Sequence, residues 1–147
     1  MNTYSGIFFS VLTVPKYEEP IKTLKDLERV AKRGDYEVVT TLNTFYYDLF
    51  VKAECCGPYH TIGKAIKKTN LPLPENTRSG IELVDREALD HNRVIFIEAY
   101  VSLFFGVRTY ATIEMHISSE TLMMDQMAMA LQKGSPLLET MNKALVI

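Results

Sequence analysis

Hydrophobic positions recur with helical or strand-like periods along most of the chain, and they predict alternating helices and short strands. Apolar residues three and four apart over residues 24–31 predict a helix, for which Thr23 and Asp26 form a capping box. Gly34 follows two basic residues, as is typical of a helix C-terminus. The β-branched run at residues 36–41 then predicts a short buried strand.

The middle of the chain repeats this alternation. Asn43 or Thr44 is a suitable N-cap for a helix from Phe45 to about Glu54, which Gly57-Pro58 ends. A short helix is expected around residues 62–66, followed by a loop at Leu71–Pro74. Ser79 with Glu82 predicts a capping box and a helix behind it, which a turn at residues 90–93 ends. An apolar strand is then expected at Val94–Ile97, and a short apolar helix through Phe105.

The C-terminal part predicts two more strands and one more helix. Ile113, Met115 and Ile117 alternate with polar residues, the pattern of a half-buried strand. A second strand is expected at residues 126–131. Ser135-Pro136 supplies an N-cap and a proline at the first helical position, so a terminal helix is expected toward Val146. The whole pattern predicts an α/β fold.

The first 14 residues form an uncharged, mostly apolar stretch that turns polar at Pro15-Lys16. A secretory signal needs a basic residue before its apolar core, and no Lys or Arg precedes Lys16. Two interpretations remain: a buried element of a soluble core, or the end of a membrane helix that begins upstream. The length of the stretch does not separate them.

Composition and charge narrow the class of protein. The 147 residues are enough for one domain with a sizeable core. Sixteen basic and 18 acidic residues give a net charge of -2, which is no footprint for nucleic acid or an acidic membrane surface. The two cysteines, Cys55 and Cys56, are neighbours, and neighbours rarely bridge. Two buried thiols, or pairing of each elsewhere, are both compatible with the sequence.

Metal-binding and nucleophilic motifs are weak. His60, His91 and His116 are scattered, without a second ligand at metal-site spacing, and no cofactor is expected. A nucleophilic Cys55 or Cys56 would need a nearby base, so a structural role is favoured and an enzyme is not expected.

Two positions are candidates for ligand binding. Glu98 directly follows the apolar strand at Val94–Ile97, and open α/β sheets bind ligands at the carboxyl ends of strands. It also precedes a predicted helix, so simple stabilisation of that helix N-terminus is the more common alternative. The N–H groups and hydroxyl at Thr44 form a second candidate, for an anion, with plain N-capping as its alternative.

Four motifs, in order along the chain, resemble a known family. Residues 4–13 resemble the end of a pore-lining third membrane helix with its gate motif. Residues 20–27 are similar to the segment P-I-x-[ST]-x-x-[DE]-L, and residues 94–98 resemble a strand that ends in an agonist-binding acid. Residues 133–137 are similar to K-G-S-[PS]-L. The chain resembles the second ligand-binding segment of ionotropic glutamate receptors, and most closely the arthropod chemosensory ionotropic receptors.

The resemblance implies a fragment of a ligand-gated cation channel subunit in the plasma membrane, which assembles with other subunits, as a tetramer, and binds a small ligand between two lobes. Residues 1–14 would be the extracellular end of a membrane helix, residues 15–22 a linker, and residues 23–147 a periplasmic-binding-protein-like lobe with a mixed sheet flanked by helices. The implied ligand-binding residues are Glu98, Thr44, Phe45 and Tyr46, and the implied gating residues are Tyr4, Phe8, Leu12 and Thr13.

The chain also departs from the family pattern. Glutamate-binding members have a small Gly-Ser-Thr stretch where this chain has Thr44-Phe45-Tyr46, so an amine or a small odorant-like molecule is expected instead of a dicarboxylate. Cys55 and Cys56 do not lie at the positions of the family's disulfide. A soluble solute-binding lobe, a coreceptor subunit that binds no ligand, and, last, a small enzyme with a cysteine nucleophile remain as alternatives.

Overall fold

A computed structural model describes residues 21–118, 120 and 130–145 of the chain. The predicted gate at residues 1–14 and most of the linker therefore lie outside the described residues. The elements in chain order are α2 (Leu24–Arg33), β1 (Glu37–Thr40), α3 (Phe45–Val51), α4 (Pro58–Lys68), α5 (Thr77–Leu89), β2 (Val94–Ile97), α6 (Tyr100–Tyr110) and α7 (Leu138–Leu145).

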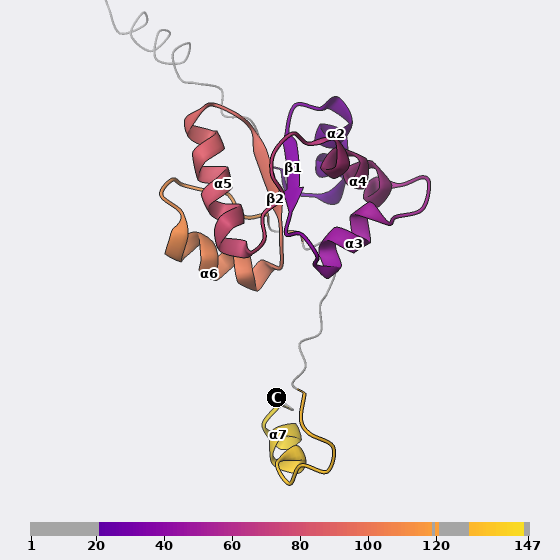
Figure 1. Ribbon diagram of the computed structural model, residues 1–147, viewed down its shortest axis with the longest axis vertical. Coiled ribbons are helices and arrows are strands. Elements are labelled where there is room, and N and C mark those ends of the chain that lie inside the picture. Colours follow the sequence, from indigo (N-terminus) through magenta and orange to yellow (C-terminus); the bar gives the residue numbers. More distant parts are fainter. Residues whose placement is uncertain (1–20, 119, 121–129, 146–147) are drawn as a thin grey trace, which may run out of the picture.

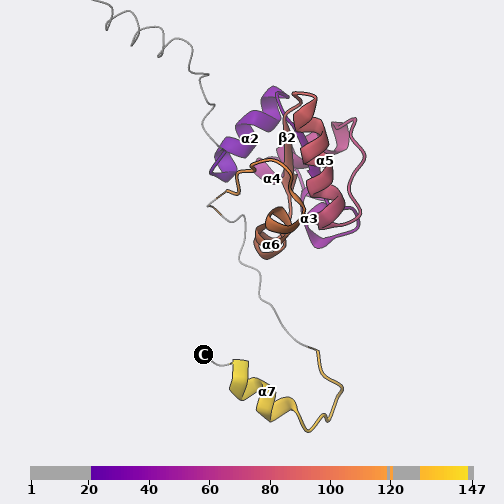
Figure 2. The ribbon, with the colours of Figure 1, turned by 90° about the vertical axis from the view of Figure 1, so that its left-hand side faces the viewer.

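Strands β1 and β2 pair in parallel, with Glu37 opposite Val94 and Thr40 opposite Ile97. Parallel neighbours need a long crossover, which α3, α4 and α5 provide here. Both views of the ribbon place β2 between α2 on one side and α5 on the other (Figures 1 and 2). The described part of the chain is thus a small α/β unit, as predicted. Its sheet consists of one parallel pair of strands, whereas a mixed sheet was expected.

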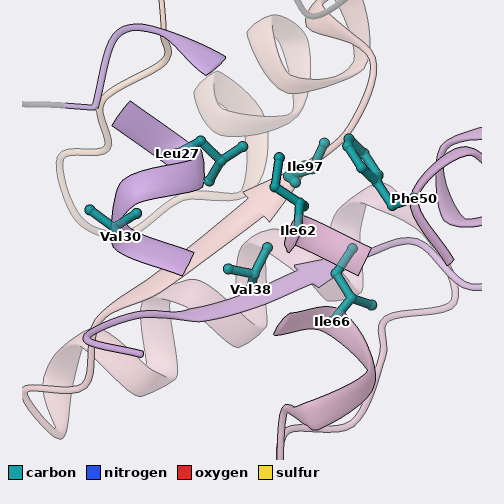
Figure 3. Packing of buried hydrophobic residues seen from close by; sticks show 7 residues of the cluster. All are labelled: Leu27, Val30, Val38, Phe50, Ile62, Ile66 and Ile97. Carbon is teal, nitrogen blue, oxygen red and sulfur yellow. The ribbon is translucent and has the colours of Figure 1, made fainter. Parts of the chain in front are cut away.

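The main core lies between the sheet and the layer formed by α2, α3 and α4. Val38 and Val39, consecutive in β1, are both fully buried, which shows that helices cover both faces of the strand. Spacings of three and four residues bring the apolar sides of α2 and α4 onto one of these faces. Figure 3 shows the resulting cluster, which consists of Leu27, Val30, Val38, Phe50, Ile62, Ile66 and Ile97.

The predicted ends of α2 are confirmed. The Thr23 hydroxyl accepts the N–H of Asp26, the Asp26 carboxylate accepts the N–H of Thr23, and Gly34 ends the helix in the left-handed region at φ 73°. The capping box predicted at Ser79 and Glu82 is wrong. Helix α5 begins at Thr77, two residues before Ser79, because Asn76 takes the N-cap and Ser79 the third helical position.

The strand predicted at Ile113–Ile117 is also wrong. Its odd-numbered residues are half-buried and its even-numbered ones exposed, as the alternation predicted, but no strand pairs with it among the described residues. The segment instead runs past the start of α2, where the Ser118 hydroxyl donates to the carbonyl of Lys22 at 2.8 Å. Alternation reports which side is buried, and burial alone does not supply a hydrogen-bonded neighbour.

The remaining differences concern element ends and one region that is mostly undescribed. The apolar helix expected through Phe105 continues to Tyr110, and α3 ends at Val51, three residues earlier than expected. The terminal helix begins at Leu138, because Pro136 lies in a turn. Of the strand expected at residues 126–131, only Ala130 and Leu131 are described, and neither is in a strand.

Helix α6 is held on α5 by one side and by its C-terminal end. A Cβ atom at Gly106 would lie 2.6 Å from Ile81 Cδ1, so any larger residue here would require the end of the Ile81 side chain to shift. The buried Asp85 carboxylate accepts the N–H of Thr112 at 2.7 Å and its hydroxyl at 2.9 Å. Its second oxygen, Oδ1, has no hydrogen-bond partner among the described residues. These contacts fix the chain just after α6 to the middle of α5.

Cys55 and Cys56 form a disulfide with each other in the exposed turn between α3 and α4. The predictions of two buried thiols and of pairing elsewhere are therefore both wrong. Bridged cysteines usually stand further apart along the chain, so their usual spacing does not predict a bond between direct neighbours.

Within the described residues, no helix combines the length and the apolar character needed to cross a membrane.

Candidate functional site

The candidate site lies where the two parallel strands end side by side. In this register Thr41 follows β1 and Glu98 follows β2, so their side chains emerge at the same edge of the sheet. The Thr40 hydroxyl, one residue earlier, donates to the carbonyl oxygen of Ile97 at 2.9 Å. This bond ties the two strand ends together and fixes the positions from which Thr41 and Glu98 start.

The Glu98 carboxylate is held by two donors. The Thr41 hydroxyl donates to Oε2, and the backbone N–H of Ala99 donates to Oε1 at 2.9 Å. An ionised carboxylate accepts about four hydrogen bonds, so these two leave acceptor capacity on both oxygens. Glu98 is half-buried, which keeps that capacity within reach of a ligand. The two hydrogen bonds orient the carboxylate and leave it able to accept further hydrogen bonds.

Glu98 does not act as an ordinary N-cap of α6. The N-cap position is Ala99, and no side chain accepts a hydrogen bond from the first turn of the helix. The Glu98 carboxylate instead bonds to the N–H of Ala99 itself, before the helix begins. The carboxylate still lies at the N-terminus of α6, so stabilisation of that terminus remains an alternative to ligand binding.

Thr44 is the N-cap of α3, and its hydroxyl has two partners. It accepts the N–H of Tyr47 at 3.3 Å and donates to the carbonyl oxygen of Thr41 at 2.7 Å. Asn43, at φ 59°, makes the left-handed turn between strand and helix, a conformation that Asn tolerates better than most residues. Thr44 therefore performs the plain capping role that the sequence left open, and it also connects α3 to the residue that holds Glu98.

Phe45 and Tyr46 follow at the start of α3, with their rings edge to face and 5.8 Å between centroids. The Phe45 side chain is 58% exposed, and Tyr100 at the start of α6 is 50% exposed. Single exposed aromatic side chains are common, and they mark contact sites when several gather in one patch. The two helix N-termini beside Glu98 thus present aromatic side chains to solvent.

Of the residues that the sequence had proposed for ligand binding, Glu98 and Thr44 are connected through Thr41 at one edge of the sheet, and Phe45 and Tyr46 follow Thr44 at the start of α3. The gating candidates Tyr4, Phe8, Leu12 and Thr13 lie outside the described residues. Thr41 was missed. The signal that could have identified it is its position directly after β1, because residues that follow neighbouring parallel strands lie at the same edge.

The other sequence candidates stay apart from this edge. In the disulfide, neither Cys55 nor Cys56 carries a free thiol, and the His60 Nδ1 atom lies 3.1 Å from the carbonyl oxygen of Ala53. Across the described part of the chain, no three His, Cys, Asp or Glu side chains gather in a way that could hold a metal ion.

Comparison with known proteins returned no match to a protein-family model, to a curated protein or to a solved structure.

Proposed function

We propose that this chain contributes the second lobe of the ligand-binding domain of a ligand-gated cation channel subunit of the ionotropic glutamate receptor type. The lobe would have the periplasmic-binding-protein-like architecture and would close against a first lobe on another part of the receptor. The observation that carries the proposal is the Glu98 carboxylate, which follows β2 at the carboxyl edge of the sheet and is oriented by Thr41 and Ala99.

The proposed ligand is a small molecule with a protonated amino group. A half-buried carboxylate with free acceptor capacity suits an ammonium group, because a charge-assisted hydrogen bond is stronger than a neutral one. Phe45 and Tyr46 take the place of small hydroxyl residues in glutamate-binding relatives, and they supply apolar area and fewer hydrogen-bonding groups. This combination favours an amine or a small odorant-like amine over a dicarboxylate.

The proposed mechanism is closure of two lobes around the ligand, which pulls on the gate through the linker at residues 15–22. A ligand shifts this equilibrium only as far as it binds the closed state more tightly than the open one. Glu98 would contribute this difference by reaching the ammonium group only when the first lobe holds the rest of the molecule. Tyr4, Phe8, Leu12 and Thr13 would belong to the gate that responds, in a tetramer of subunits in the plasma membrane.

Recordings from the full receptor that carries this segment test the proposal, with a panel of primary alkylamines and the corresponding alcohols as probes. Glu98→Gln should raise the half-maximal amine concentration about 10- to 100-fold, the range expected for loss of one charge-assisted hydrogen bond. Glu82→Gln is the matched control, because Glu82 pairs with Arg78 on the exposed side of α5. An unchanged amine response in Glu98→Gln, at equal surface expression, would overturn the assignment of Glu98.

A further inference from the structure

The disulfide between Cys55 and Cys56 lies in the short turn that joins α3, which ends at Val51, to α4, which begins at Pro58. Both cysteines are exposed. A disulfide stabilises a fold mainly by closing a loop of chain, and the effect grows with the length of that loop. A bond between neighbours closes almost no loop, so it contributes little to the stability of the whole domain.

The exposure of the two cysteines also determines how readily the bond between them can react. Thiol–disulfide exchange needs a thiolate to reach one of the two sulfur atoms, and exposed disulfides are the ones that exchange readily. A bond that stabilises little and is open to solvent is better suited to reversible chemistry than to a structural role. We infer that Cys55 and Cys56 form a redox modification site, which an external dithiol reduces while the domain remains folded.

Reduction of this disulfide would proceed by two thiol–disulfide exchange steps. One thiolate of the dithiol attacks the sulfur of either cysteine and forms a mixed disulfide, while the other cysteine leaves as a thiolate. The second thiol of the reagent then attacks the mixed disulfide and releases the remaining cysteine. Two electrons and two protons pass to the protein, which gains two thiols, and the reagent becomes a cyclic disulfide.

The contacts around the turn indicate which neighbouring segments change when the disulfide is reduced. Cys56 has φ 77°, a left-handed conformation that is unfavourable for most residues other than glycine, and reduction removes the bond that ties it to Cys55. The His60 ring nitrogen beside Ala53 O and the Thr61 hydroxyl bonded to Gly57 O connect the same turn to α4. Loosening of the turn should therefore reach the end of α3 and the first turn of α4.

Deeper contacts keep the two helices together in both redox states. The Phe50 and Tyr59 rings stack with centroids 5.6 Å apart, and Gly63 packs directly against the carbonyl of Phe50. These groups belong to the buried core or lie against it. Reduction is thus expected to change the turn and to leave the fold and the Glu98 site in place.

The test uses the full chain purified in air without reductant. Alkylation with N-ethylmaleimide under denaturing conditions, read by mass spectrometry, should add no label before reduction. After dithiothreitol treatment of the folded protein it should add two labels, with far-ultraviolet circular dichroism unchanged. Hydrogen exchange should then rise in residues 53–58 and stay constant in β1 and β2.

Two variants complete the test. Cys55→Ser should take one label without any reductant, and Cys55→Ser/Cys56→Ser should take none in either state and show the exchange of the reduced chain at residues 53–58. Two labels before reduction, a disulfide between two chains on a non-reducing gel, or a bond that yields to dithiothreitol only after denaturation would each overturn the inference.

Discussion

Helices α2 and α6 lie on opposite sides of the sheet and are of similar length, 10 and 11 residues, but the sequence specifies them differently. Helix α2 has a capping box at its start and a left-handed glycine at its end, and it buries Leu27 and Val30 while its four basic residues are exposed. Local signals and core packing agree along its whole length. Such a helix forms where its sequence indicates.

Helix α6 lacks a side-chain cap, and Gly106 is its one buried residue. Three apolar residues elsewhere around the helix, Tyr100, Val101 and Phe105, are 48% to 63% exposed. A surface helix normally places polar residues there. Helix α2 is thus determined by its own sequence and the core, whereas α6 depends on its contacts with α5 and leaves apolar area exposed.

The largest expected effect comes from adding one methyl group at the helix contacts on each side of the sheet. A Cβ at Gly63 would lie 2.0 Å from the carbonyl oxygen of Phe50, which is backbone and cannot move aside. Gly63→Ala should therefore lower the free energy of unfolding by about 3 kcal/mol, near the upper end for overpacking. At Gly106 the obstacle is the end of the Ile81 side chain, so Gly106→Ala should lower it by about 1 kcal/mol.

Urea unfolding followed by circular dichroism measures both variants. Because both glycines lie inside helices, the intrinsic gain of alanine over glycine is the same at the two positions and cancels in the comparison. Equal losses would show that α6 is packed as rigidly as α4, and the contrast between the two sides of the sheet would fail.

The bond between Asp85 and Thr112 is the second target. Asp85→Ala removes the acceptor for the N–H and the hydroxyl of Thr112, and should lower the free energy of unfolding by about 2 kcal/mol. Asp85→Asn retains one oxygen acceptor and should lose less than half of that. Hydrogen exchange at the Thr112 amide checks that the lost hydrogen bonds cause the destabilisation, since it should accelerate more in Asp85→Ala than in Asp85→Asn. A full loss in Asp85→Asn would instead point to the charge of the carboxylate.

The same contrast explains what the sequence could predict. The ends of α2 were predicted because Thr23, Asp26 and Gly34 act within one or two turns of chain. The two strands were predicted because their residues are mostly β-branched or aromatic, and Glu98 was noticed because it directly follows the second strand. Ile113–Ile117 was mistaken for a strand because the same alternation arises when a chain lies along a neighbour without pairing.

Contacts between residues far apart in the sequence could not be predicted from the hydrophobic pattern. Thr41 meets Glu98 only because β1 and β2 pair in one particular register, across 57 positions of sequence. Asp85 reaches Thr112 only through the crossing of α5 and α6 over Gly106. The disulfide of Cys55 and Cys56 depends on the turn between α3 and α4. Each of these contacts is set by packing, which periodicity along the chain does not encode.

The third prediction concerns the capping box of α2. The Thr23 hydroxyl also donates a hydrogen bond to Asp26 Oδ2 at 2.9 Å, and this bond is the largest of the causes that lower the pKa of Asp26 below its ordinary value of 3.8. A carboxyl with a lowered folded-state pKa contributes stability above its unfolded pKa and loses that contribution as the pH falls through the folded pKa. Thr23→Ala should cost about 1 kcal/mol at neutral pH, the usual cost of losing a cap.

The pH dependence distinguishes this cause from a general loss of helix stability. The difference between Thr23→Ala and the parent chain should narrow as the pH falls below 3.8, because protonated Asp26 no longer benefits from the bond. Lys25→Ala, at the exposed neighbouring position, is the control and should show a constant difference. A constant difference in Thr23→Ala as well would mean that Asp26 does not take part.

The smallest expected effect tests whether the outer side of α6 is open to solvent. Val101→Thr replaces a methyl group by a hydroxyl on that side, and should change the free energy of unfolding by less than about 0.5 kcal/mol. The same substitution at the buried Val30 of α2 places a hydroxyl in the core where no hydrogen-bond partner is provided for it, and should lower the free energy of unfolding by about 2 kcal/mol. Because both sites are β-branched and helical, propensity cancels and burial alone separates them. A loss in Val101→Thr as large as that in Val30→Thr would mean that the outer side of α6 is covered in solution, and that the two helices are packed alike.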